Sequence, residues 1–126
     1  MAGRRAARRT ALFLLYQWDL TGKPLASLYE GEVDPFALET ARAVSERVGE
    51  LDRRLNEALQ DWTVDRLGAL ERNILRIAAY EIEGKTVPCE VAINEAVELA
   101  KRYTTDDAAR LVNGALGNIA REGGRE

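Results

Sequence analysis

Four arginines stand near the start of the sequence, in the run GRRAARR that ends at Arg9. Arg4, Arg5, Arg8 and Arg9 add a charge of +4 to a chain whose net charge is −3, so the remaining sequence carries about −7. A basic segment on an acidic chain favours a local contact with an anion, such as a phosphate, over general nucleic-acid binding by the whole surface. The arginines also fall at the first turn of a predicted helix, where the helix dipole disfavours cations. A solvated tail without a partner would show the same charges.

Arg5, Arg9, Leu12 and Tyr16 are spaced four, three and four residues apart. At this spacing they share one edge of a helix, separate from its apolar face. Guanidinium groups bind phosphates through paired hydrogen bonds, and a tyrosine ring can stack on an exposed base. The edge therefore suits single-stranded RNA. The alternative is that Tyr16 is a half-buried residue of the core.

The side chains needed for most catalytic sites are missing from the sequence. There is no histidine, and Cys89 is the only cysteine. Their absence excludes histidine-based acid–base catalysis, Cys–His nucleophile pairs and histidine-containing zinc sites. A lone cysteine also excludes an internal disulfide and fits a reducing, cytoplasmic environment. We therefore expect no catalytic residue, no metal site and no cofactor.

The apolar spacing predicts a single all-α domain of 126 residues, without a membrane-spanning segment. Asp34 is predicted to cap a helix that starts at Pro35, and Gly49 is predicted to break the apolar run that follows. The other predicted helices cover residues 6–20, a short stretch at 25–29, and then 67–83, 91–103 and 105–121.

Three polar or small residues lie inside the last two predicted helices. Asn94 and Asn113 interrupt apolar segments, so we expect their amides to be buried and hydrogen-bonded to neighbouring helix ends or loops. Gly114 is a poor helix former, and its predicted role is a close approach between two helices.

Several segments together resemble the NusB family of transcription antitermination factors. They are RRAAR (residues 4–8), ALFLLYQWD (11–19), Trp62 with DRL (65–67), ERNILRIAAYE (71–81), Pro88, VAINEAVELAK (91–101) and LVNGAL (111–116). The resemblance covers nearly the whole chain, and its blocks keep their order and spacing. Two positions depart from the family pattern. Leu111 stands where the family often has a phenylalanine, which removes a ring that could stack on a base, and Gly117 replaces part of a common Val-Leu-Asp ending.

The resemblance implies a fold of two small helical bundles packed into one domain of about seven helices. It implies binding of boxA-type single-stranded RNA from ribosomal RNA leader transcripts, together with the ribosomal protein NusE, and loading of that complex onto RNA polymerase. Some members of the family form homodimers, so a homodimer is one state that the resemblance allows.

The resemblance also implies the site residues. The RNA-binding set in the family pattern corresponds here to Arg4, Arg5, Arg8, Arg9, Tyr16, Asp107 and Arg110. Glu71 and Arg76 match positions of the partner surface. Residues 1–9 are expected to form a basic N-terminal arm, whose deletion would weaken RNA binding and leave the folded core intact.

Two other functions remain open at this point. NusB-like domains also occur at the start of ribosomal RNA 5-methylcytosine methyltransferases, so the chain could be the RNA-binding unit of such an enzyme. The chain could also be a helical homodimeric interaction protein without any RNA role. Titration with boxA-like RNA would distinguish this last alternative from RNA binding.

Overall fold

The computed structural model describes residues 3–123, and it contains six α-helices and two short 3-10 helices. The α-helices are α1 (Arg4–Thr21), α2 (Pro35–Glu46), α3 (Val48–Ala58), α4 (Ala69–Gly84), α5 (Cys89–Tyr103) and α6 (Asp106–Gly123), and the 3-10 helices are η1 (Leu25–Ser27) and η2 (Val64–Arg66). No strand occurs within residues 3–123. The predicted all-α class is therefore confirmed, and the bounds of α1, α4, α5 and α6 lie within two residues of the predicted ones.

Local capping interactions explain where several helices begin and end. The Asp34 carboxylate accepts hydrogen bonds from the backbone N–H groups of Phe36 and Ala37, and Pro35 follows at the first helical position, as predicted. Gly22 ends α1 in the left-handed region at φ 69°. The Thr105 hydroxyl accepts a hydrogen bond from the N–H of Ala108 at 3.1 Å and caps α6.

Two predicted helix breaks were misplaced. Gly49 lies inside α3, and the chain turns between α2 and α3 at Arg47, whose φ is −111°. The predicted end of the next helix at residue 83 is also early, because α4 includes Gly84 and the left-handed residue that follows it is Lys85, at φ 54°. In each case a glycine lies within about two residues of the observed turn. Tertiary packing decides which residue near the glycine adopts the turn conformation.

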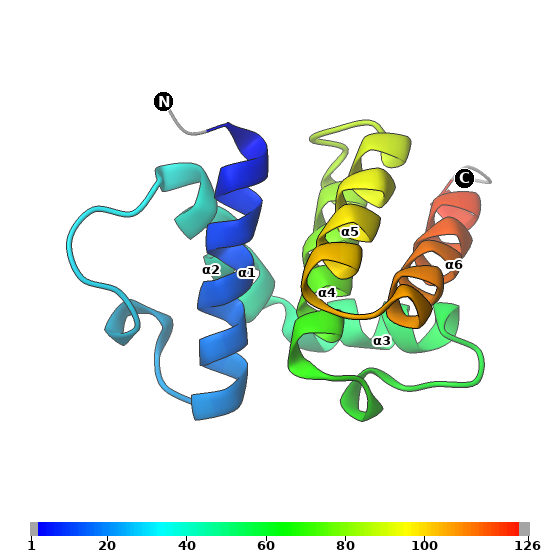
Figure 1. Ribbon diagram of the computed structural model, residues 1–126, viewed down its shortest axis with the longest axis horizontal. Helices are drawn as coiled ribbons and strands as arrows, with labels where there is room; N and C mark the ends of the chain where they lie inside the picture. The colour runs from blue at the N-terminus through cyan, green and yellow to red at the C-terminus, as the bar shows by residue number, and fades with distance from the viewer. Residues whose placement is uncertain (1–2, 124–126) are drawn as a thin grey trace.

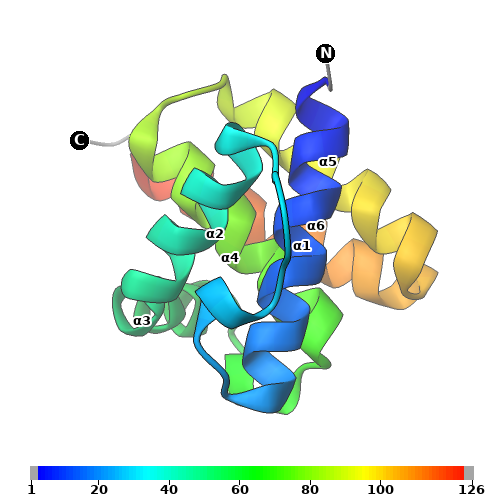
Figure 2. The same cartoon turned by 90° about the vertical axis from the view of Figure 1, so that its left-hand side faces the viewer.

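The helices form two groups that meet at α4. Helix α1 packs against α2, and both contact α4, whereas α5 and α6 pack against each other and against α4. Helix α3 crosses below α4 and α6 in Figure 1, and Figure 2 shows α2 and α1 in front of α4 and α5. The largest fully buried side chains come from both groups and include Leu12, Leu15, Leu51, Leu55, Ile74, Leu75, Leu116 and Ile119. The predicted pair of packed bundles is thus observed, with α4 shared between them.

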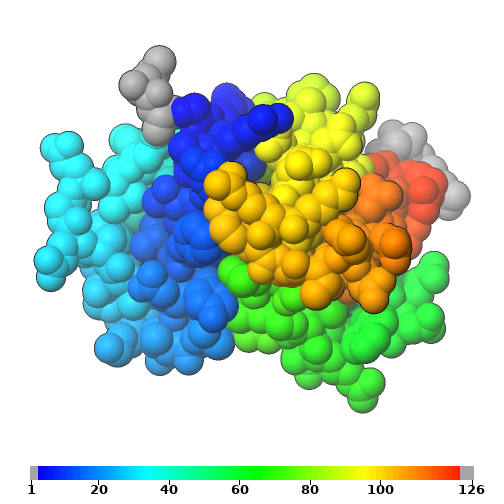
Figure 3. Space-filling model, viewed as in Figure 1, coloured from blue at the N-terminus to red at the C-terminus, as the bar shows by residue number. Residues whose placement is uncertain are grey.

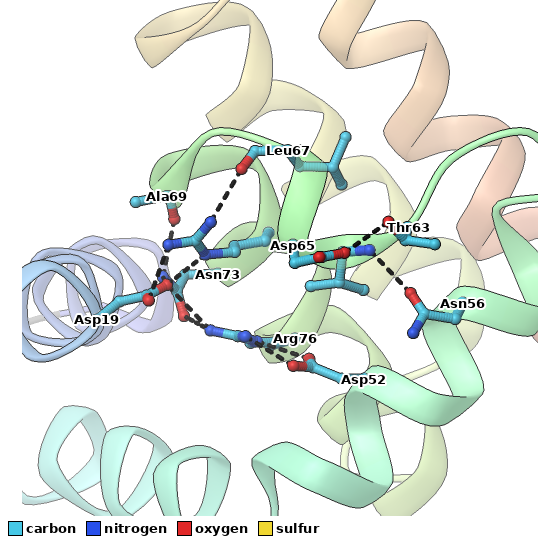
Figure 4. A network of polar contacts seen from close by, with 11 residues as sticks. Asp19, Asp52, Asn56, Thr63, Asp65, Leu67, Ala69, Asn73 and Arg76 are labelled. Carbon is cyan, nitrogen blue, oxygen red and sulfur yellow. Dashed lines mark hydrogen bonds and ion pairs between the residues drawn. The ribbon is translucent and has the colours of Figure 1, made fainter. Parts of the chain in front are cut away.

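A buried polar network joins the two groups (Figure 4). Asp19, near the end of α1, accepts hydrogen bonds from Arg72 at 2.8 Å, from Asn73 at 2.9 Å and from Arg76 at 3.1 Å. Arg76 also forms a double hydrogen bond to Asp52 of α3, at 2.7 Å for each pair of atoms. The network fixes α1, α3 and α4 relative to one another, because each charge in it would be costly to bury without its partners.

The pKa of Asp19 reflects this environment. Burial raises it, but the hydrogen bonds from Arg72 and Asn73 and the positive charges of Arg76 and Arg72 outweigh burial and hold the Asp19 pKa below its ordinary value. Asp19 is therefore ionised near neutral pH and contributes its ion pairs to the junction.

Candidate RNA-binding surface

The four N-terminal arginines point in different directions, because they belong to α1 rather than to a separate arm. The guanidinium of Arg4 lies 5.0 Å from the ring centroid of Phe36, on the α2 side of the helix. Arg5 reaches the opposite side and donates a hydrogen bond to Glu95 of α5 at 2.9 Å. Only part of the predicted arginine cluster can therefore contact one ligand. Of the four arginines, Arg5 and Arg9 are exposed or half-buried and line the same groove, between α1 and α5.

Arg8 is buried, which corrects the prediction that it contacts RNA phosphates. Its guanidinium donates to both carboxylate oxygens of Glu81 at 2.7 to 3.0 Å, and both side chains are 5% exposed. A paired, desolvated guanidinium of this kind is committed to the fold. Ala7 is also buried. Deleting residues 1–9 would therefore remove part of the core, and the expectation of an intact core after that deletion is wrong.

A groove of about 430 Å³ separates the first turns of α1 from α5. Its lining includes four cations at its surface, Arg5, Arg9, Lys101 and Arg102, together with Glu95 and Glu98. Figure 3 shows this face, with the blue N-terminal turns of α1 next to the yellow α5 and the orange α6 beyond it. Because Arg8 is neutralised by Glu81, the groove carries about two more positive than negative charges, which favours a phosphate backbone.

Arg5 remains charged in this groove. Its hydrogen bond to Glu95 and the attraction of that carboxylate raise the pKa of Arg5 above its ordinary value. The Arg5 side chain is 78% exposed, whereas that of Glu95 is 16% exposed. An ion pair with one such exposed member is weak, so Arg5 can exchange Glu95 for a phosphate.

Four residues beside the groove were not among the predicted site residues: Lys101, Arg102, Phe13 and Tyr103. Phe13 and Tyr103 make an edge-to-face contact with their ring centroids 5.2 Å apart, and Arg102 lies 5.5 Å from the Tyr103 ring centroid. The run Lys101-Arg102-Tyr103 was a usable signal, since two cations and an aromatic residue end α5 beside one another. Neither ring lines the groove itself, but Arg102 does, and its contact with Tyr103 places this aromatic pair next to the groove.

The predicted edge of α1 is wrong at Leu12, which belongs to the buried core. Tyr16 and Arg9 are half-buried and Arg5 is exposed, but Leu12 is fully buried. The exposed face of α1 is shifted toward Phe13, which is 38% exposed. Tyr16 therefore lies at the boundary between core and surface, and its role in RNA stacking stays a prediction.

Asp107 and Arg110 lie at the exposed start of α6, with 2.8 Å between the Arg110 nitrogen and the Asp107 oxygen. A second hollow lies between α5 and α6, and its lining includes Arg110, Lys101, Asn94 and Asn113. Both asparagines are exposed, so the prediction that they are buried packing residues is wrong. Their amides can donate and accept hydrogen bonds at the surface of this hollow.

The two predicted partner residues differ in their surroundings. Arg76 is only 6% exposed, and the carboxylates of Asp52 and Asp19 hold its guanidinium, so the structure does not support a direct partner contact by Arg76. The Glu71 carboxylate lies against Gly68 at the start of α4 and is half-buried. Glu71 thus stays a predicted partner residue.

Other kinds of site find little support within residues 3–123. This part of the chain holds no group of three or more histidine, cysteine, aspartate or glutamate side chains with the spacing to bind a metal ion. None of its helices combines the length and the apolar character required to cross a membrane. Cys89 is exposed at the start of α5.

The chain is similar to known proteins over most of its length. A model of the NusB family matches residues 5–121. The transcription antitermination protein NusB of Rubrobacter xylanophilus is 42% identical over 120 residues, which cover 90% of this chain and 86% of that protein. The protein of the same name from Bacillus subtilis is 39% identical over 122 residues, covering 92% of this chain and 93% of that protein.

Solved structures give the same result for the fold. T. maritima NusB aligns with a TM-score of 0.84 at 32% identity, covering 96% of this chain and 92% of that chain. A crystal structure of the antitermination factors NusB and NusE in complex with dsRNA contains a chain that aligns with a TM-score of 0.82 at 28% identity, covering 94% of this chain and 96% of that chain. The resemblance found in the sequence is therefore confirmed, and the chain belongs to the NusB family.

Proposed function

We propose that this protein is a non-catalytic, RNA-binding factor of transcription antitermination. It binds boxA-type single-stranded RNA of ribosomal RNA leader transcripts together with the ribosomal protein NusE. The observation that carries the proposal is the groove between α1 and α5, in which Arg5, Arg9, Lys101 and Arg102 line one continuous surface. The solved complex of a similar chain with NusE and dsRNA supports RNA and NusE as the partners.

The chemistry of the groove fits a single RNA strand. Exposed guanidinium and ammonium groups neutralise phosphates and release their counterions, which supplies affinity without reading sequence. Phe13, Tyr16 and Tyr103 lie on the helices that form its walls and provide rings on which unpaired bases can stack. Further along the surface, Asn94, Asn113 and Arg110 can form hydrogen bonds to base edges.

A second surface fits NusE, at the place where the end of α1 meets the start of α4. Leu20 is 58% exposed there, a large value for a leucine that follows directly on Asp19 of the buried network. Asp19 binds Arg72, which brings Leu20 and the half-buried Glu71 to the same part of the molecule. Leu20 can supply the apolar centre of a small interface with NusE, and the Glu71 carboxylate can supply part of its polar rim.

The complex with NusE and RNA would then join RNA polymerase with other Nus factors, in the cytoplasm. On this proposal the protein contributes binding surfaces only and needs neither a metal ion nor a cofactor. Its effect on transcription follows from holding a transcript segment and a protein partner at the same time.

The proposal is tested by titrating the protein with fluorescent boxA-type single-stranded RNA, with and without NusE, at two salt concentrations. We expect binding that weakens at higher salt and becomes tighter when NusE is present. An RNA of the same composition in scrambled order is the control and should bind more weakly. Equal affinity for both RNAs, or no effect of NusE, would contradict the proposed function.

A further inference from the structure

A third hollow, of about 380 Å³, lies between the end of α3 and the outer face of α6. Its most unusual lining residue is Trp62, whose side chain is 49% exposed on the loop between α3 and η2. The opposite wall consists of α6 residues and includes Arg110, Gly114 and Arg121. Trp18 packs against the core and Trp62 is not among the side chains that do, so the Trp62 indole is available to a ligand.

Gly114 points to the same conclusion. Within residues 3–123, no residue of another element lies close to Gly114. A Cβ atom added at Gly114 would have no heavy atom of this part of the chain within 4 Å except those of its chain neighbours and of the backbone of its own helix. The predicted close approach between helices at this position is therefore wrong. Glycine is a poor residue for the middle of a helix, and neither packing nor a positive φ requires it here. Because glycine has no side chain, this exposed position on α6 instead leaves room for a planar group of a bound ligand.

Hydrogen bonds hold the loop that carries Trp62 at both of its ends. Asn118 of α6 donates a hydrogen bond to the backbone oxygen of Ala58 at 2.9 Å, and Asn56 accepts one from the backbone N–H of Val64 at 2.8 Å. Between these points Gln60 adopts the left-handed conformation at φ 56°. A fixed loop presents the Trp62 ring in a defined place, which lowers the entropy lost when a ligand stacks on it.

The third hollow continues the surface already described. Lys101 lines both the α1–α5 groove and the hollow between α5 and α6, and Arg110 lines both that hollow and the one at Trp62. A path therefore runs from α1 across α5 and α6 to the loop after α3, which passes beneath α6 in Figure 1. Cations follow one another along it, from Arg5 through Lys101 and Arg110 to Arg121.

We propose that the RNA strand held by Arg5 and Arg9 continues past Lys101 and Arg110, and that one of its bases stacks on Trp62 over Gly114. This inference rests on the proposed function and extends its footprint to the far side of α6. Two arginines against the single carboxylate of Asp61 make the hollow attractive to a phosphate backbone. The exposed pair of Arg110 with Asp107 is weak enough for a phosphate to displace.

The charges favour RNA over a protein as the occupant. Arg121 donates to Asn118 beside Gly114, so a guanidinium stands at the wall where the base would lie. An indole ring can stack on any base, because every base has a π-face. Trp62 would thus add affinity for a longer strand with little preference for sequence.

The test compares two RNAs. The first is the shortest boxA-type strand whose binding depends on Arg9, so that Arg9→Ala weakens it. The second is the same strand made longer, with the extra nucleotides added at the 5′ end in one version and at the 3′ end in another. We expect extension at one end to tighten binding, and Trp62→Ala to remove about tenfold of the affinity for the extended strand alone. Trp62→Phe should keep most of that affinity, because it keeps a ring. Val91→Ala is the control, since Val91 is also 41% exposed but lines none of these three hollows.

Gly114→Ala provides a second variant that does not depend on the loop. It should keep or raise the melting temperature, because alanine favours helix, and still weaken binding of the extended strand. Tryptophan fluorescence gives an independent signal. The extended strand should quench the wild-type emission, and Trp62→Phe should abolish the quenching although Trp18 remains.

Each negative result has a distinct meaning. If the short strand binds through Arg9 while extension adds no affinity, or if Trp62→Ala leaves the affinity for the extended strand unchanged, the RNA does not continue to Trp62. The proposed function stands in both cases. If Trp62→Ala weakens binding of a protein partner and leaves both RNAs unaffected, the hollow is a protein interface and the inference is overturned. If neither RNA binds, both the proposed function and the continuation of the RNA to Trp62 are wrong.

Discussion

Arg5 and Glu95 face each other across the groove between α1 and α5, with the Arg5 Nε donating to a Glu95 carboxylate oxygen at 2.9 Å. The exposed guanidinium is thereby held over the groove by a carboxylate that is only 16% exposed. The carboxylate both orients the arginine and repels an incoming phosphate. Glu95 should therefore limit the affinity of the groove for RNA.

Replacing this carboxylate should strengthen RNA binding. We expect Glu95→Gln to tighten binding of boxA-type RNA by up to about fivefold, because it removes a carboxylate that repels phosphates and competes with them for Arg5. Glu90→Gln is the matched control, because Glu90 lies on the same helix but does not line the groove. The affinities would be measured by fluorescence anisotropy. Equal gains in the two variants would show that only net charge matters and that Glu95 has no special position.

Arg8 and Arg9 are adjacent in sequence and should behave in opposite ways. Arg9→Ala should lower RNA affinity and reduce the slope of log K against log salt by about one unit, with little change in melting temperature. Arg8→Ala should instead destabilise the fold by about 3–5 kcal/mol, because it leaves the Glu81 charge buried without its partner. Chemical denaturation and RNA titration of both variants would check this pair of outcomes. A stable Arg8→Ala protein with lost RNA binding would restore Arg8 to the RNA surface.

Tyr16 lies at the boundary between core and surface, so its two roles need separate measurements. We expect Tyr16→Ala to weaken RNA binding by about 1–3 kcal/mol through lost stacking. Tyr16→Phe should cost less, since it keeps the ring and removes only the hydroxyl. Melting temperatures provide the control. A strong loss of stability in Tyr16→Ala, combined with unchanged RNA affinity of the folded protein, would make Tyr16 a core residue only.

Asp19 should make the fold sensitive to acid. The Asp19 pKa is lower in the folded protein than its ordinary value of 3.8, so its ion pairs stabilise the fold fully above that value. The stabilisation declines as the pH falls below 3.8 and is lost once the pH passes below the folded pKa. Asp19→Asn should cost about 3 kcal/mol near neutral pH, because Arg72 and Arg76 lose a charged partner.

Urea denaturation at several pH values would measure this effect. The difference in unfolding free energy between the wild type and Asp19→Asn should be constant from neutral pH down to about pH 5 and shrink below about pH 4. A difference that stays the same at pH 3 would show that the hydrogen bonds of Asp19, rather than its charge, hold the junction.

The fold could be predicted from the sequence because the signals are local. Apolar residues recur at helical spacing, and Asp34 and Gly22 carry the capping chemistry that their neighbours require. The break at Arg47 could not be placed, since Gly49 is a stronger local signal and only packing moved the turn to the earlier residue.

The site was harder to predict because burial decides which charges reach a ligand. Arg8 and Arg9 look alike in sequence, yet the distant Glu81 binds Arg8 and removes it from the surface. Asn94 and Asn113 looked like packing residues, and only the arrangement of α5 and α6 shows that they face outward into one hollow. Spacing along a helix identifies its edges, but the neighbouring helices determine which edge stays exposed.

The central claim is that the groove between α1 and α5 holds RNA. It is tested most directly by titrating boxA-type single-stranded RNA into the NusE complex of wild type and of a variant with Arg5, Arg9, Lys101 and Arg102 changed to glutamine. Each of these side chains contacts solvent, so the variant should fold and keep its NusE partner. We predict that it loses most of its RNA affinity and that its salt dependence falls by up to about four units. RNA binding of unchanged affinity and unchanged salt dependence by the folded variant would contradict the account.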